Sequence, residues 1–323
     1  MGGLSATEPF YRRFVKKLQD TWTVVAPVVA ADGVCRLQKT NEAADRPCPC
    51  LPLLPLKKIF LPPYELLWSS LEGSNQLHPA SLSPAAVALI DVAPCDLYAL
   101  AYLDQAYTDD PFYQERRQRL LIIGRECSPT TFCHCPPRTA PPPFDLFFAG
   151  DAVWCGSALG AKVLQEFAGA VALKGDEALP PKYWTGQGAS LPPDLAARFL
   201  QSDGDPLWAE VAKRCLSCGA CSAACPTCAC YDVVDTVSLS GESQRQRVWD
   251  NCFFRDHGLV AGGHNFRPDR TARLRFRFEH KYLGFGGQRG ISSCVGCGRC
   301  QQVCPVEINL AHVLEKLPAL EER

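Results

Sequence analysis

The stretch Cys215–Cys230 reads CLSCGACSAACPTCAC, and the organisation of the whole chain can be worked out from it. Its first four cysteines are separated by two, two and three residues, and a proline follows them. The same spacing, again closed by a proline, returns further along the chain. The first run is Cys215, Cys218, Cys221, Cys225 and Pro226, and the second is Cys294, Cys297, Cys300, Cys304 and Pro305. Two complete copies of this spacing indicate a domain built around two paired sites.

This spacing is typical of cysteines that bind [4Fe–4S] clusters in bacterial ferredoxins. The two-residue gaps let three thiolates of one tight loop bind one cluster, while the cysteine before the proline binds the other cluster. Four cysteines can also hold zinc, but two complete runs that each end in Cys-Pro favour iron–sulfur chemistry. We therefore predict two [4Fe–4S] clusters with crossed ligand sets: Cys215, Cys218, Cys221 and Cys304 for one, and Cys294, Cys297, Cys300 and Cys225 for the other.

The composition is that of a globular protein with an unusual number of thiols. A length of 323 residues suggests two domains. The formal net charge of −1 gives no argument for a nucleic-acid or membrane partner. An odd count of 19 cysteines argues against a disulfide framework and fits reduced cluster ligands. No secretory signal follows Met1, and no apolar run reaches the roughly 18 residues of a membrane span. We expect a cytoplasmic protein that binds neither nucleic acid nor membrane.

The first half of the chain shows an alternation of strand and helix patterns. The run Thr23–Ala30 predicts a strand that enters a hairpin. Short apolar runs at Val87–Val92, Leu120–Gly124 and Asp145–Ala149 predict buried strands, and Leu97–Tyr107 has helical spacing. Such an alternation is typical of α/β folds with a mostly parallel sheet.

The second half is expected to be helical. Residues Lys174–Pro193 contain several prolines and glycines and are interpreted as a linker, after which Asp194–Leu200 begins a helix. We therefore predict an α/β N-terminal domain over residues 1–193, followed by an α-helical two-cluster ferredoxin domain over residues 194–323. The long insert between the two cysteine runs implies an enlarged, helix-rich ferredoxin domain.

Four further cysteines suggest a third site in the first domain. Cys95 and Cys127 each follow a predicted strand, and the carboxyl ends of strands in open α/β sheets are where ligands bind. Cys133-His134-Cys135 lies one short loop further on. Four thiolates complete a cluster ligand set, so we predict a third [4Fe–4S] cluster at Cys95, Cys127, Cys133 and Cys135. Four buried thiols and a four-cysteine zinc site are the alternatives.

The other candidate residues leave their roles open or indicate no catalysis. Cys228, Cys230 and Cys252 are either small buried side chains or additional ligands. We interpret Cys35, Cys48, Cys50 and Cys155 as non-ligands. The basic run of Arg267, Arg270, Arg273, Arg275, Arg277 and Lys281 is a solvated face, a counter-charge for anionic clusters or a docking face. No glycine-rich dinucleotide motif follows a strand. We therefore expect no catalytic residue and no organic-cofactor site, which leaves an electron carrier.

Several motifs carry a resemblance to a known family. The chain resembles the beta, iron–sulfur subunit of cytosolic sulfhydrogenase-type NiFe hydrogenases, and the similar iron–sulfur subunit of anaerobic sulfite reductase. The matching pieces are Pro94–Asp96, Asp110–Arg117, Cys225–Cys230, Trp249–Cys252, Ala261–Arg267, His280–Tyr282 and Cys294–Val306. Pro94–Asp96 is also similar to the cluster-binding pattern of beta subunits of deazaflavin-dependent hydrogenases, where the cluster lies beside a flavin.

The resemblance implies a relay rather than an enzyme in its own right. It implies electron transfer between the small and large subunits of a NiFe hydrogenase and a flavin-containing NAD(P) reductase subunit. The alternative implied partner is the catalytic subunit of a sirohaem sulfite reductase. A freely diffusing ferredoxin-like carrier is a third possibility, but such a carrier does not need the large first domain.

Overall fold

The structure is a computed structural model that describes residues 7–40, 51–71, 73–74, 76–81, 85–150, 152–166, 172–174, 178–184, 186, 192, 194–284 and 290–319. The chain forms two compact units that are each discontinuous in sequence. The first unit comprises residues 1–56, 83–188 and 295–297, and the second comprises residues 57–82, 189–294 and 298–323. Unlike the predicted division at residue 194, each unit therefore takes a piece from the other half of the chain.

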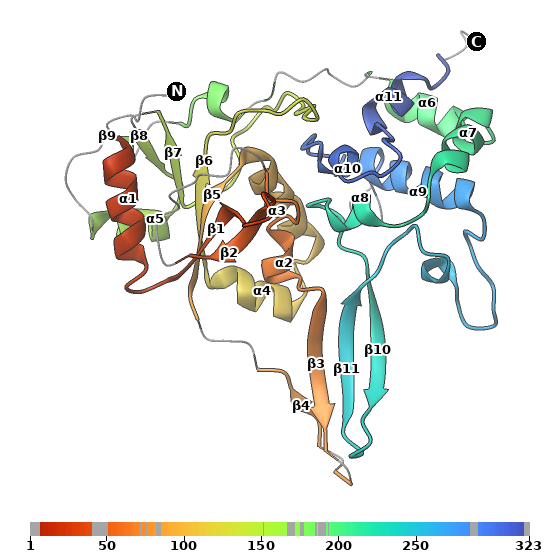
Figure 1. Cartoon of the computed structure of the whole chain (residues 1–323), viewed down its shortest axis with the longest axis horizontal. Coiled ribbons are helices and arrows are strands. Elements are labelled where there is room, and N and C mark those ends of the chain that lie inside the picture. The colour runs from red at the N-terminus through yellow and green to blue at the C-terminus, as the bar shows by residue number, and fades with distance from the viewer. Residues whose placement is uncertain are drawn as a thin grey trace. The chain divides into compact units, whose positions relative to one another are not determined.

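The first unit is built on a seven-stranded sheet of order β2-β1-β5-β6-β7-β8-β9 (Figure 1). Neighbours β1, β5, β6 and β7 are parallel, whereas β2 pairs with β1 and β8 pairs with β7 in antiparallel fashion. The predicted strands are present in a sheet that is mixed rather than all parallel. The bounds are β1 Thr23–Val29, β2 Cys35–Lys39, β5 Val87–Val92, β6 Leu120–Arg125, β7 Leu146–Ala149, β8 Ala152–Cys155 and β9 Ala172–Lys174.

Helices bury alternate residues of these strands. Phe14 and Leu18 of α1 belong to the same buried cluster as Ile90 and Ile123 of β5 and β6. Leu97 of α3 lies on the other face of the sheet, near Gly124, where an added Cβ would stand 3.0 Å from its side chain. The helices are α1 Thr7–Leu18, α3 Pro94–Ala106, α4 Pro111–Gln118 and α5 Ala158–Gln165, with the 3-10 turn η1 at Pro181–Tyr183.

The end of β5 is distorted at Asp91. This residue has a φ of 55°, and the pairing of β5 with β6 shifts register between Leu89 and Val92. The Asp91 carboxylate accepts hydrogen bonds from the Tyr11 hydroxyl at 2.7 Å and from Arg125 at 3.2 Å. A non-glycine residue in this region of φ is strained and needs such support. Cys95 and Cys127 follow the ends of β5 and β6, close to this distortion.

The second unit combines short helices with an antiparallel sheet. Trp208 of α7 packs edge-on against Phe199 of α6 and Phe278 of α9, with ring centroids 5.4 and 5.3 Å apart. All three side chains are buried. The helices are α2 Lys57–Phe60, α6 Leu195–Gln201, α7 Pro206–Arg214, α8 Ala220–Ala223, α9 Arg270–Tyr282, α10 Arg299–Gln302 and α11 Leu310–Glu315, with the 3-10 turn η2 at Asp256–Gly258.

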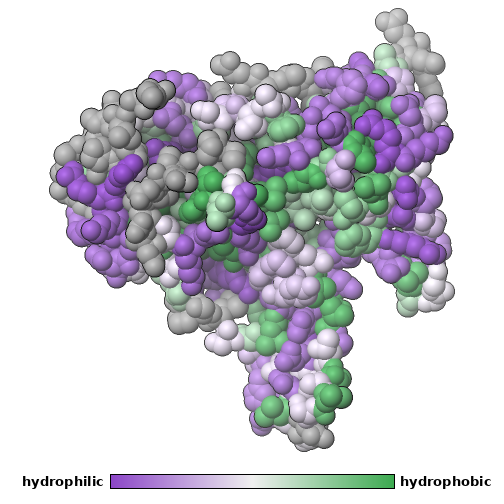
Figure 2. Space-filling view, viewed as in Figure 1, coloured by the Kyte–Doolittle hydropathy of each residue, from purple (hydrophilic) through white to green (hydrophobic). Residues whose placement is uncertain are grey.

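The insert between the two cysteine runs contains strands as well as helices, contrary to the expectation of a helix-rich insert. The hairpin β10 Tyr231–Val237 and β11 Ser243–Trp249 joins β3 Tyr64–Ser70 and β4 His78–Pro79 in the order β10-β11-β3-β4 (Figure 1). The β-branched residues of β10 favour a strand, and Gly241 supplies the positive φ of the turn. Apolar and polar side chains mix along this sheet (Figure 2), and Val237 is 72% exposed.

None of the helices within the described ranges is both long and apolar enough to cross a membrane.

Candidate iron–sulfur sites

The first predicted ligand set of the second unit surrounds one cavity. Cys215, Cys218 and Cys221 line it from one loop, and Cys304 lines it from the other cysteine run. Cys225 is not among the lining residues, although it is close in sequence. Backbone N–H groups of Ser217 and Ile308 point at the sulfur atoms of Cys215 and Cys304, at 3.4 and 3.3 Å. Cys300, which is assigned to the other ligand set, also lines this cavity. The four thiols of the predicted set around one cavity, with N–H donors aimed at sulfur, fit a [4Fe–4S] cluster.

The two cysteine loops share one backbone design. Each loop has two residues of positive φ, Ser217 and Gly219 in the first and Gly296 and Gly298 in the second. The second residue of each pair, Gly219 or Gly298, is the N-cap of a four-residue helix, α8 or α10. The tight curl of the loop lets cysteines two residues apart face the same point. The sequence repeat is therefore a structural repeat as well.

Cys225 is tied to the second loop. The hydroxyl of Thr227 donates a hydrogen bond of 2.8 Å to the carbonyl oxygen of Ser293, the residue before Cys294. Lys281 links the same two segments, because its ammonium donates to Thr227 at 2.8 Å and to the Ser293 hydroxyl at 3.1 Å. This pairing fits the predicted exchange of fourth ligands.

Residues Val295–Cys297 of the second run belong to the first unit. There Val295 and Cys297 join an apolar cluster with Ala93, Cys95 and Ala99. The backbone N–H of His134 donates to Gly296 O at 2.8 Å, and the Cys133 thiol lies 3.7 Å from Cys297 O. Gly296 must be glycine here, because an added Cβ would lie 2.5 Å from His134 O.

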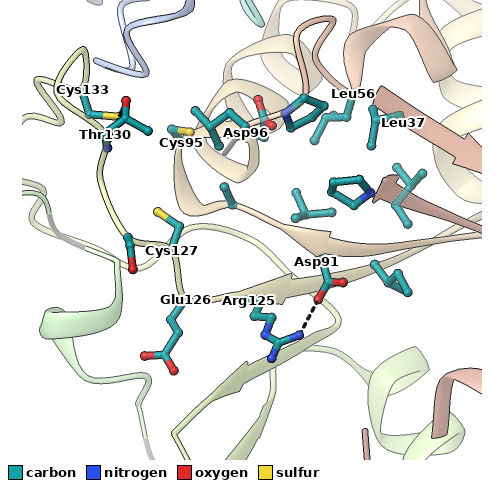
Figure 3. Close-up of a pocket in the computed structure, with 18 of the residues that line it drawn as sticks. Leu37, Leu56, Asp91, Cys95, Asp96, Arg125, Glu126, Cys127, Thr130 and Cys133 are labelled. Carbon is teal, nitrogen blue, oxygen red and sulfur yellow. Dashed lines mark hydrogen bonds and ion pairs between the residues drawn. The ribbon is translucent and has the colours of Figure 1, made fainter. Parts of the chain in front are cut away.

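The four cysteines of the predicted third site line a single cavity of about 250 Å³ in the first unit. The sulfur atoms of Cys95, Cys127 and Cys133 lie around one part of this cavity (Figure 3), and Cys135 also lines it. Cys95 stands in the first turn of α3 because Pro94 begins that helix directly after β5. Cys95 is buried, whereas Cys127 is exposed. The structure thus brings together all four residues that the sequence predicts for this site.

The pKa values of two thiols of this site, Cys133 and Cys135, shift in opposite directions. A hydrogen bond from Cys135 lowers the pKa of Cys133 to about 5, against the opposing effect of burial. The same hydrogen bond, together with burial, raises the pKa of Cys135. The lowered pKa of Cys133 favours its thiolate, which is the form that binds metal.

Three buried cations surround the segment that holds Cys225. Arg277 donates to the Ser222 hydroxyl at 2.8 Å and to the Cys228 sulfur at 3.2 Å. Although burial alone would lower it, the neighbouring thiols of Cys225 and Cys228 raise the pKa of Lys281. Burial lowers the pKa of Lys57 to about 8, which the Cys228 thiol partly offsets. Lys57 was not expected here, because it lies far from both cysteine runs in sequence.

The remaining cysteines have different surroundings. Cys252 is buried in the apolar core of the second unit, and burial raises its pKa to about 11. Cys230 is adjacent to His257, whose ring pairs with Asp250. Cys35 is disulfide-bonded, so one bond exists in a chain for which free thiols were expected. Cys155 is free, and Cys48 and Cys50 lie outside the described residues.

No three His, Cys, Asp or Glu side chains of the described ranges stand close enough to hold a single metal ion. The first and third predicted ligand sets each line a cavity.

The chain is similar to known iron–sulfur proteins. Residues 214–308 match the family described as the 4Fe-4S dicluster domain. Fold and ligand pattern thus define an iron–sulfur electron-transport protein with a ferredoxin-type domain. The chain is similar to sulfhydrogenase 2 subunit beta of Pyrococcus furiosus, with 31% identity over 326 residues. The alignment covers 95% of this chain and 96% of that relative. It belongs to the family of sulfhydrogenase beta subunits. No solved structure matches the chain.

Proposed function

We propose that this chain is the electron-transfer subunit of a cytoplasmic, NAD(P)-linked NiFe hydrogenase. It relays electrons between the small and large hydrogenase subunits and a flavin-containing NAD(P) reductase subunit. The observation that carries the proposal is the convergence of Cys215, Cys218, Cys221 and Cys304 on one cavity, in a chain that belongs to the sulfhydrogenase beta family.

The relay would contain three cluster sites. Cys215, Cys218, Cys221 and Cys304 would hold one [4Fe–4S] cluster, and Cys225, Cys294, Cys297 and Cys300 would hold a second. The cavity of the first unit supports a third cluster at Cys95, Cys127, Cys133 and Cys135. Bound clusters supply one-electron transfer, and the chain's own part is to hold them and to set their surroundings.

The third site would exchange electrons directly with the second. Cys133 lies 3.7 Å from the carbonyl oxygen of Cys297, and Cys95 packs in the same apolar cluster as Cys297. A ligand of each site thus lies within one packed group of residues. The third site would therefore be the entry or exit point for the flavin-containing partner.

A second candidate partner is the catalytic subunit of a sirohaem sulfite reductase, because the motifs around Cys225–Cys230 and Ala261–Arg267 also resemble the iron–sulfur subunit of that enzyme. Purification of the native complex separates the two. We expect nickel and no sirohaem absorbance in the complex that contains this chain. Sirohaem without nickel would overturn the hydrogenase assignment and leave the relay role intact.

A further inference from the structure

Lys57, Arg277 and Lys281 of the second unit are buried without a carboxylate within ion-pair distance among the residues that the structure describes. Lys57, Arg277 and Lys281 have exposed fractions of 2%, 2% and 4%. Their hydrogen bonds go to carbonyl oxygens, hydroxyls and one sulfur. A buried charge is costly unless an opposite charge balances it. The balancing charge must therefore come from another group.

All three cations converge on the short segment 221–228. Arg277 donates to Cys221 O at 3.2 Å, and Lys281 donates to Thr227. Lys57 donates to Ser222 O at 3.0 Å and to Cys228 O at 2.6 Å. Cys225 stands in the middle of this segment, so the group bound there is the natural counter-ion.

Lys57 lies in a different part of the sequence from the other two cations. Arg277 and Lys281 lie on α9, inside the stretch that matches the dicluster domain, whereas Lys57 begins the separate helix α2. The Trp249 ring covers its ammonium at 4.5 Å, and the Trp249 indole donates to Leu61 O at 2.9 Å. Lys57 thus reaches the segment around Cys225 from α2, a helix that lies outside the matched dicluster domain.

We propose that Lys57 balances the charge of the cluster bound through Cys225 and raises its reduction potential. This inference rests on the proposed ligand set. Four thiolates make such a site anionic, and reduction adds one electron and one further negative charge. A fixed cation in a low-dielectric interior stabilises the reduced form more than the oxidised form. Net charge and hydrogen bonding around a cluster are known determinants of its potential.

The test is a redox titration of the intact complex, followed by the electron paramagnetic resonance signals of its reduced [4Fe–4S] clusters. In Lys57→Met, we expect the equilibrium constant for reduction of one cluster to fall at least tenfold, which is a potential lower by about 59 mV for a one-electron couple. Lys57→Arg keeps the charge and should keep most of the potential. Lys213→Met is the matched control, because Lys213 is exposed on α7 near Cys215 and solvent screens it.

Unchanged cluster potentials in Lys57→Met would overturn the inference. If Lys57→Met does not retain its iron, Lys57→Gln provides the same comparison, because its amide can still donate to Cys228 O. Loss of one cluster in both neutral variants but not in Lys57→Arg would also support the charge requirement. Loss of the cluster in Lys57→Arg as well would mean that the shape of the side chain matters rather than its charge. That result would overturn the inference. Absence of [4Fe–4S] signals from the unaltered complex would instead refute the proposed function.

Discussion

At the scale of single residues, Gly296 is a point where a cysteine loop closely approaches the backbone of another segment. It has a φ of 69°, and a side chain would collide with His134 O. We expect Gly296→Ala to destabilise the protein by roughly 1–3 kcal/mol, with loss of iron from the adjacent sites. Thermal unfolding and iron analysis measure both effects.

Gly262→Ala is the matched control for this variant. Gly262 also has a positive φ, of 88°, but nothing lies within 4 Å of the position that its Cβ would take. The two variants share the backbone strain and differ only in the collision. Equal loss of stability and full retention of iron in both would contradict the role given to Gly296.

The crossed ligand sets predict which cysteine variants behave alike. Cys225→Ser should lose the same cluster as Cys297→Ser, because both residues belong to the second set. Cys304→Ser should instead resemble Cys218→Ser. Electron paramagnetic resonance spectra of the reduced variants separate the two classes. A Cys225→Ser spectrum that matches Cys218→Ser would refute the crossing.

At the scale of elements, the 3-10 turn η2 is fastened to the end of β11 by His257 and Asp250. Hydrogen bonds to Cys230 and Asp250 raise the pKa of His257 from 6.5 to about 9. A raised histidine pKa stabilises the folded state fully below about pH 6.5, and this stabilisation disappears as pH rises through about 9.

We therefore expect His257→Gln to lower the thermal midpoint at about pH 6 by roughly 2–4 °C per kcal/mol lost, and to have little effect at about pH 10. The exposed His312 on α11 offers a control, since His312→Gln should change the midpoint little at either pH. A His257→Gln effect of the same size at both pH values would show that its charge is not involved.

The elements of the first unit were largely predictable from sequence. Continuous apolar runs such as Val87–Val92 predict buried strands in an α/β fold. The cysteines that follow these strands lie at the same edge of the sheet because the strands are parallel. The hairpin of β10 and β11 was missed because β10 is mostly exposed, β11 is mostly half-buried, and neither strand shows a clear alternation. The place of Lys57 beside Cys228, and of Val295–Cys297 in the first unit, was missed because only long-range packing brings these residues there.

At the scale of the whole molecule, the chain is expected to work as a member of a complex. It belongs to a family of sulfhydrogenase beta subunits, and we assign it no catalytic residue of its own. Size-exclusion chromatography with mass measurement, on material from its own host, should find it only in a larger assembly. A stable, redox-active monomer as the sole species would contradict this expectation.

The most direct test of the three-cluster relay is the iron and acid-labile sulfide content of the purified full chain. The account predicts about twelve of each per chain, falling to about eight in Cys95→Ser. A content of about eight that Cys95→Ser leaves unchanged would contradict it.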